Sequence, residues 1–201
     1  QKVPILENHP LSAQSPYAAS KIAADQLSLS FYKSYGLPVT IMRPFNTFGP
    51  RQSARAIIPT IITQLLQRKN VIKLGNLTPT RDFTYIDDTV NAFLNAMKAK
   101  KISGEVINIG NKFEISIKDI LEIINKDFKY HFDIKIDKKR KRSKNSEVYR
   151  LRASNTKAAK ILKWRPKYEG LKGFKKGLEK TINWFSEPKN LKYYNSDIYN
   201  I

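Results

Sequence analysis

Cysteine is absent from this chain of 201 residues, and so are long apolar runs. Without cysteine the protein has neither a disulfide framework nor a thiolate nucleophile, which fits a reducing cytoplasm. No stretch approaches the roughly 20 consecutive apolar residues that a membrane-spanning helix needs. Because 41% of the residues are still apolar, the sequence predicts a soluble, cytoplasmic protein with a sizeable core.

Histidine and acidic residues are also scarce. The two histidines, His9 and His131, have no metal-ligand spacing, so we expect no metal site. Only 17 acidic residues oppose 37 lysines and arginines, and the net charge is +20. The densest basic run, residues 138–142, raises the question of nucleic-acid binding. Neither an RNA-recognition signature nor a basic stripe with interleaved aromatics accompanies it, and a basic surface also suits a diphosphate substrate. We interpret nucleic-acid binding as the weaker alternative.

The chain does contain a tyrosine and a lysine that are spaced for chemistry. Residues 15–21 read SPYAASK, and Tyr17 and Lys21 are four positions apart, on one face of an expected helix. Ser15 is placed to cap this helix, and Pro16 suits its first turn. An ammonium beside a phenol favours the phenolate, which can take a proton from a hydroxyl. For this short pattern alone, an ordinary amphipathic helix is the alternative.

Two further motifs follow in order. Residues 43–52 read RPFNTFGPRQ, and residues 81–88 read RDFTYIDD. Together with SPYAASK, their order and spacing resemble the extended short-chain dehydrogenase/reductase superfamily. Within it, the chain looks like the NAD-dependent nucleotide-sugar epimerases and 4,6-dehydratases. The resemblance covers roughly residues 1–185.

The resemblance implies a role for each residue of the first two motifs that could touch the cofactor or the sugar. Tyr17 would be the catalytic base that removes the proton of the sugar 4-hydroxyl. Lys21 would bind the nicotinamide ribose of NAD and favour the phenolate. Pro44 and Phe45 would lie beside the nicotinamide, and Asn46 would contact the nucleotide sugar.

Arginines are the expected ligands of the substrate diphosphate, because the forked donors of a guanidinium meet two phosphate oxygens at once. Arg81 matches the diphosphate arginine of the family, with an ion pair to Asp82 as its alternative and a structural role for Asp82. Arg51 and Arg55 lie in the same loop as the second motif and either face the diphosphate or are solvated.

A second diphosphate arginine is expected in the basic run. Arg142 is the best match, but the family carries Arg-Pro there and this chain has Ser143 after the arginine. The alignment therefore leaves Arg140 as an alternative.

Strands and helices alternate along the chain, which is typical of an α/β fold. We expect helices from residue 16 onward and over 56–68, 87–98, 116–126, 155–162 and 171–185, with strands over 38–42, 71–74, 83–86, 105–109 and 131–136. Asp87 and Asp88 are expected to cap the third helix and Ser116 the fourth, whose buried face is Ile117, Ile120, Leu121 and Ile124. Residues 43–55 are expected to form a ligand loop, and the end beyond Pro188 to be a frayed tail.

By resemblance, the fold is the C-terminal part of a Rossmann-like parallel sheet plus a smaller α/β substrate-binding domain. Residues 1–55 would be a remnant of the NAD-binding Rossmann domain that carries the Tyr-x-x-x-Lys helix. Residues 56–185 would be mainly the substrate-binding domain, with 76–111 partly returning to the Rossmann sheet, and 186–201 would be a tail.

The glycine-rich half of such an enzyme is missing. The eight glycines do not form the Gly-x-x-Gly-x-x-Gly turn that binds dinucleotide phosphates. We therefore expect the chain to be the C-terminal part of a larger enzyme, inactive and unable to hold NAD alone. The full-length relatives imply a homodimer, for which Leu27, Phe31 and Ile61 are candidate contacts, with packing in the core of the chain as an equal alternative.

The implied reaction is oxidation at C4 of a hexose carried on a nucleoside diphosphate, with the hydride passing to NAD. A 4,6-dehydratase then eliminates water between C5 and C6 and returns the hydride to C6, whereas a 4-epimerase returns it to C4. Residues 51–60 look most like the UDP-N-acetylglucosamine 4,6-dehydratases, and we expect that activity. A 4-epimerase and a non-catalytic substrate-domain fragment are the alternatives.

Overall fold

The computed structural model describes residues 2–67, 70–141 and 143–194. Within them, no helix is both long and apolar enough to cross a membrane. The helices and strands follow one another as α1 (Pro16–Tyr35), β1 (Ile41–Pro44), β2 (Asn46–Phe48), α2 (Ile57–Leu66), β3 (Val71–Leu74), β4 (Thr80–Tyr85), α3 (Ile86–Lys98), β5 (Val106–Ile109), β6 (Glu114–Ser116), α4 (Ile117–Phe128), β7 (Asp133–Ile136), β8 (Arg150–Leu151), α5 (Thr156–Ile161), α6 (Gly170–Ser186) and α7 (Pro188–Leu191), with short 3-10 turns at Lys138–Arg140 and Lys144–Ser146.

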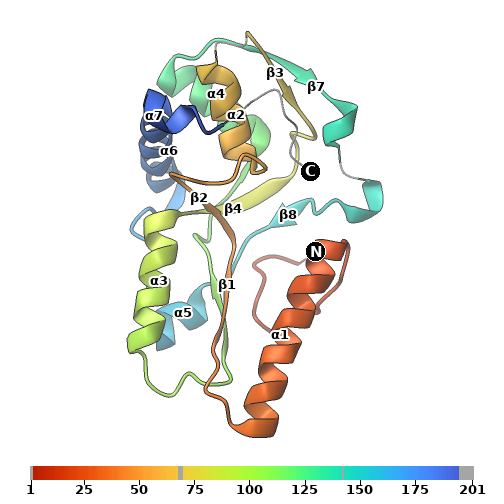
Figure 1. Ribbon diagram of the computed structural model, residues 1–201, viewed down its shortest axis with the longest axis vertical. Helices are drawn as coiled ribbons and strands as arrows, with labels where there is room; N and C mark the ends of the chain where they lie inside the picture. Colours follow the sequence, from red (N-terminus) through yellow and green to blue (C-terminus); the bar gives the residue numbers. More distant parts are fainter. Residues whose placement is uncertain (1, 68–69, 142, 195–201) are drawn as a thin grey trace.

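In the described part of the chain, the strands form three small sheets. β1 pairs with β5 in parallel, with Ile41 opposite Val106 and Pro44 opposite Ile109. In the second sheet β4 pairs in parallel with β2 and β8 and antiparallel with β6. β3 and β7 form a separate parallel pair. Figure 1 shows α1 on one side of β1 and both α3 and α5 on the other. The expected α/β fold with parallel strands is confirmed, whereas the division into domains stays a prediction.

Two apolar clusters hold these elements together. The larger packs α2, α4 and α6 around β4, with Phe48, Phe83 and Phe174 at its centre. The smaller packs β5 against α3 and the α5 region, and its largest member is Trp164. Ile61, a candidate for a dimer contact, lies fully buried in the larger cluster. That assignment is wrong, because the apolar face of α2 packs inside its own chain.

Most helix boundaries follow from local sequence signals. Ser15 caps α1 by accepting the backbone N–H of Ala18, with Pro16 at the first turn. Ser116 and Asp119 form a capping box at the start of α4. The predicted buried face of α4 is confirmed in full: Ile117, Ile120, Leu121 and Ile124.

Three local predictions are wrong. The ligand loop expected over 43–55 contains β2, a three-residue strand that exists because it pairs with β4. Asp88 does not cap α3, since its carboxylate accepts the distant backbone N–H groups of Lys167 and Tyr168. The expected tail is folded over residues 188–194, where α7 is followed by Tyr194 packed on Phe185.

α1 is attached to the rest of the chain in an unusual way. None of its 20 residues is buried. Near its middle, Asp25 pairs with Arg43 of β1 at 2.6 Å, and Arg43 also donates to the carbonyl of Glu7. Near its C-terminal end, the ring of Tyr32 lies against Gly104, where an added Cβ would fall 2.2 Å from the ring. A polar pair thus joins this helix to β1, and an aromatic contact joins it to the turn before β5.

Candidate active site

The tyrosine and lysine of the first motif lie together as predicted from their spacing. Both are exposed on the first turns of α1, and the Nζ atom of Lys21 lies 5.5 Å from the centre of the Tyr17 ring. Tyr17 is 72% exposed. The phenol of Tyr17 lies next to an ammonium and is accessible to a ligand. This arrangement is compatible with general-base chemistry.

Tyr17 lines a cleft of about 730 Å³ at the N-terminal end of α1. The cleft brings α1 together with the end of β1, with β2 and with the segment before β8. Its lining consists of Ser15, Tyr17, Pro44, Phe45, Asn46, Thr47, Arg81, Ser146, Val148 and Leu151. Three residues expected beside the cofactor or sugar, Pro44, Phe45 and Asn46, are therefore in one cleft with Tyr17.

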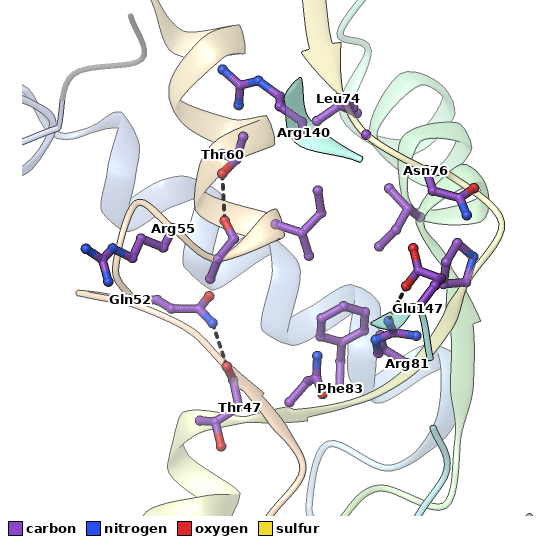
Figure 2. A pocket seen from close by; sticks show the side chains of 16 residues that line it. Thr47, Gln52, Arg55, Thr60, Leu74, Asn76, Arg81, Phe83, Arg140 and Glu147 are labelled. Atoms are coloured by element: carbon purple, nitrogen blue, oxygen red, sulfur yellow. Dashed lines mark hydrogen bonds and ion pairs between the residues drawn. The ribbon is translucent and has the colours of Figure 1, made fainter. Parts of the chain in front are cut away.

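A second cleft, of about 320 Å³, opens between α2, the end of β3 and β4 (Figure 2). It is lined by polar and basic groups that include Gln52, Arg55, Asn76, Arg140 and Glu147, over an apolar floor that includes Ile57, Leu74 and Phe83. Asn46, Thr47 and Arg81 line both clefts. The two clefts therefore adjoin along these three side chains.

Hydrogen bonds from both terminal nitrogens of its guanidinium hold Arg81 in place. One nitrogen donates to the carbonyl of Thr80 at 2.9 Å and to that of Val148 at 2.6 Å. The other pairs with Glu147 at 3.3 Å, as Figure 2 shows. The alternative expected for Arg81, an ion pair with Asp82, is wrong because successive strand residues point to opposite faces.

Asp82 is fully buried on the opposite face of β4. It accepts the backbone N–H groups of Asn111 at 2.7 Å and Ala153 at 3.0 Å. Burial raises the pKa of this carboxyl to about 7, although those two donors and that of Lys112 act in the opposite direction. Asp82 ties β4 to the chain after β5 and after β8, which is the structural role predicted for it.

The remaining predicted arginines do not all come together. Arg55 lines the smaller cleft, although Figure 2 shows its side chain extending outward. Arg51 is exposed and lines neither cleft. Arg142 lies outside the described residues. Arg140, the alternative to Arg142, lines the smaller cleft.

Several cleft residues were not singled out from the sequence. Thr47 bonds to Thr89 of α3 at 3.0 Å, which anchors β2 beside the junction of the clefts. Glu147 lies more than sixty positions after its partner Arg81. In the sequence, Glu147 stands out only as the single acidic residue of the basic segment 138–150.

The two clefts are lined by side chains of different chemistry. The larger cleft is lined by the phenol of Tyr17, whose ring centre lies 5.5 Å from the Lys21 ammonium, and by Pro44 and Phe45. The smaller offers arginines, amides and an apolar floor, a set suited to a diphosphate and the group attached to it.

Comparison with known proteins identifies the family. A model of the family described as GDP-mannose 4,6 dehydratase matches residues 1–180. Human dTDP-D-glucose 4,6-dehydratase is 33% identical over 186 residues, which cover 90% of this chain and 51% of the human protein. A putative UDP-glucose 4-epimerase of Methanocaldococcus jannaschii is 31% identical over 185 residues, covering 90% of this chain and 57% of that protein.

A solved structure gives the same result. The crystal structure of UDP-glucuronic acid 4-epimerase from Bacillus cereus, in complex with UDP-glucuronic acid and NAD, has a TM-score of 0.83 to this chain at 30% identity, covering 96% of this chain and 58% of the epimerase. The chain thus spans about half the length of the curated relatives it matches. It belongs to the GDP-mannose 4,6-dehydratase family, among the NAD-dependent nucleotide-sugar epimerases and dehydratases of the extended short-chain dehydrogenase/reductase superfamily.

Proposed function

We propose that this chain supplies the catalytic tyrosine and the substrate site of an NAD-dependent nucleotide-sugar 4,6-dehydratase. The observation that carries the proposal is the junction of the two clefts. Tyr17 lines one, Arg55 and Arg140 line the other, and Asn46 and Arg81 line both. A hexose at the junction would meet the phenol while the diphosphate attached to it meets the guanidinium groups.

In this proposal each side chain has a defined task. The oxygen of Tyr17 takes the proton of the sugar 4-hydroxyl, and Lys21 stabilises the phenolate that does so. Arg81 binds the diphosphate, with its orientation set by Glu147 and the carbonyl of Val148. Pro44 and Phe45 would lie beside the nicotinamide of NAD, which, when bound, would supply the acceptor for the hydride from C4.

The proposed substrate is UDP-N-acetylglucosamine. Its support is the sequence of residues 51–60, which includes the cleft residues Gln52, Arg55, Ala56 and Thr60. Relatives named for dTDP-glucose 4,6-dehydratase and for UDP-glucuronate 4-epimerase support the wider class of nucleotide sugars. The 4-epimerase is the second candidate function, since it would use the same Tyr17 and Lys21. We also propose a cytoplasmic homodimer for the intact enzyme.

One experiment separates the candidates. A protein in which a glycine-rich NAD-binding half precedes this chain is incubated with NAD and UDP-N-acetylglucosamine, and the product is examined by mass spectrometry. A product lighter by one water is expected for the 4,6-dehydratase. An unchanged mass with interconverted 4-epimers would assign the epimerase. Parallel reactions with dTDP-glucose and UDP-glucuronic acid test the sugar and base, and no change with any of them would contradict the proposal.

A further inference from the structure

Residues 181–194 lie outside the match to the family, yet they are folded beside the proposed substrate site. After α6, residues 187–194, here called the C-terminal segment, turn back across the larger core. Tyr194 stacks edge-to-face on Phe185 with ring centres 4.7 Å apart, and it also meets Trp184 at 6.3 Å. Asn190 donates to the carbonyl of Trp184 at 2.8 Å. These contacts hold the C-terminal segment against the end of α6.

From that position Tyr194 reaches residues 49–56, here called the substrate loop. Its hydroxyl donates to the backbone carbonyl of Gln52 at 3.1 Å. Its own carbonyl accepts from the side chain of Gln67, just after α2, at 3.0 Å. Tyr194 therefore connects the end of α2 to the middle of the loop that precedes α2.

Among the described residues, the other hydrogen bonds of the substrate loop are to itself and to the elements on either side of it. Gln52 N–H donates to the carbonyl of Gly49 at 3.4 Å, and Ala56 N–H to that of Ser53 at 3.0 Å. Thr60 of α2 donates from its hydroxyl to the carbonyls of Ala54 and Ala56, at 3.0 and 2.8 Å, which fixes the end of the loop but not Gln52. The side chain of Gln52 donates to the carbonyl of Thr47 at 2.6 Å. Gln52, Arg55 and Ala56 line the smaller cleft. The bonds of Gln52 to Thr47 and Tyr194 therefore fix part of one wall of that cleft.

We propose that Tyr194 is a positioning residue, which latches the substrate loop from the C-terminal segment and so raises the affinity of the smaller cleft for a nucleoside diphosphate. The inference rests on the proposed function for the identity of the ligand. The inference goes beyond the proposed function because it assigns a role to a segment that the family match does not reach. When a loop becomes ordered only on binding, the lost conformational entropy lowers the affinity. A loop that is already ordered in the free protein avoids this loss.

The test compares two neighbouring tyrosines in the 201-residue chain. Tyr194→Phe keeps the ring on Phe185 and removes only the hydroxyl. Tyr193→Phe is the matched control, because Tyr193 is 77% exposed. The dissociation constant for UDP, measured by titration calorimetry, is expected to rise about threefold to tenfold in Tyr194→Phe, as for the loss of one hydrogen bond. Tyr193→Phe is expected to bind as the parent chain does.

Amide hydrogen exchange gives a readout that needs no ligand. In Tyr194→Phe the amides of Gln52 and Ala56 are expected to exchange about threefold to tenfold faster. The amides of Gly104 and Glu105, in the remote turn before β5, are expected to keep their rates. A general loss of stability would instead accelerate both groups.

The outcomes separate the latch from the proposed function. If the parent chain binds no UDP, the proposed nucleotide site is wrong, and the latch is judged by exchange alone. If the parent chain binds UDP and Tyr194→Phe matches it in affinity and in exchange at Gln52 and Ala56, the latch is wrong and the site stands.

Discussion

At the scale of single residues, Tyr17 carries the sharpest prediction. In a protein with the NAD-binding half in place, Tyr17→Phe is expected to abolish turnover, because phenylalanine has no oxygen to accept the proton of the 4-hydroxyl. Binding of NAD and of the nucleotide sugar is expected to persist. Tyr35→Phe, at a 78% exposed position of the same helix, is the control and should remain active. Turnover by Tyr17→Phe would show that Tyr17 is not the base.

Arg81 is predicted to contribute most of the diphosphate affinity at the junction of the clefts. Arg81→Ala is expected to weaken UDP binding by this chain about tenfold to hundredfold, the effect of losing charge-assisted hydrogen bonds. The UDP affinity of Arg81→Lys should lie between those of the parent chain and of Arg81→Ala, because lysine keeps the positive charge but lacks the forked donors of the guanidinium. Titration calorimetry measures both, with Arg165→Ala at an exposed position as the control. Equal affinity in Arg81→Ala would remove Arg81 from the site.

Asp82 makes the stability of the fold depend on pH. Its folded pKa of about 7 lies above the ordinary value of 3.8, so between those values the folded state binds a proton that the unfolded state has released. The free energy of unfolding is therefore expected to fall as the pH rises from about 4 to 7, by at most about 4 kcal/mol from this group. Denaturant titrations at several pH values measure the slope.

Two controls isolate the contribution of Asp82. Asp82→Asn removes the titrating group, so its unfolding free energy should change less steeply between pH 4 and 7, whatever its absolute stability. Carboxyl-carbon NMR shifts of Asp82 in the parent chain report the pKa directly. A midpoint near 4 would contradict the expected dependence.

At the scale of elements, the attachment of α1 gives a steric prediction. Gly104 has φ +82° and Gly36 has φ +67°, so an alanine at either costs about 1 to 2 kcal/mol in backbone strain. At Gly36 an added Cβ meets nothing within 4 Å, whereas at Gly104 it meets the Tyr32 ring at 2.2 Å. Gly104→Ala is therefore expected to destabilise the protein more than Gly36→Ala in denaturant titrations. The difference should shrink when Tyr32→Ala is added to both, and an unchanged difference would contradict the contact.

The elements also show which local signals suffice. Ser15 and Ser116 cap their helices as expected, because a cap depends on residues within one turn of each other. β2 escaped prediction since a three-residue strand has no measurable period and exists through its partner β4. Asp88 was misread for a related reason: an acid in the first turn of a helix suits the dipole, but its hydrogen bonds go to a turn eighty positions later.

For the whole molecule, the missing glycine-rich turn leads to a binding prediction. The 201-residue chain alone is expected to bind UDP-sugars and to show no measurable affinity for NAD, because the glycine-rich turn that binds dinucleotide phosphates is absent from its sequence. Titration calorimetry with both ligands measures this. Tight binding of NAD by this chain would contradict the view that it lacks the phosphate site.

The net charge of +20 allows the nucleic-acid alternative to be tested in the same way. Binding through the basic run at 138–142 would extend to any polyanion and weaken steeply with salt. Binding in the clefts should favour the nucleotide sugar over inorganic phosphate and should depend less on salt. Competition between UDP-N-acetylglucosamine and a single-stranded oligonucleotide at two salt concentrations distinguishes these cases.

The sequence by itself determined the α/β fold, the family and the Tyr17–Lys21 pair, because motif order, helical spacing and caps are local properties of the chain. Only the tertiary structure decided that Asn46 and Arg81 stand where two clefts meet, that Arg81 pairs with Glu147 rather than Asp82, and that Tyr194 reaches Gln52. These contacts join residues far apart along the chain. They depend on how strands pair and which face of each strand is buried, and no local pattern records that.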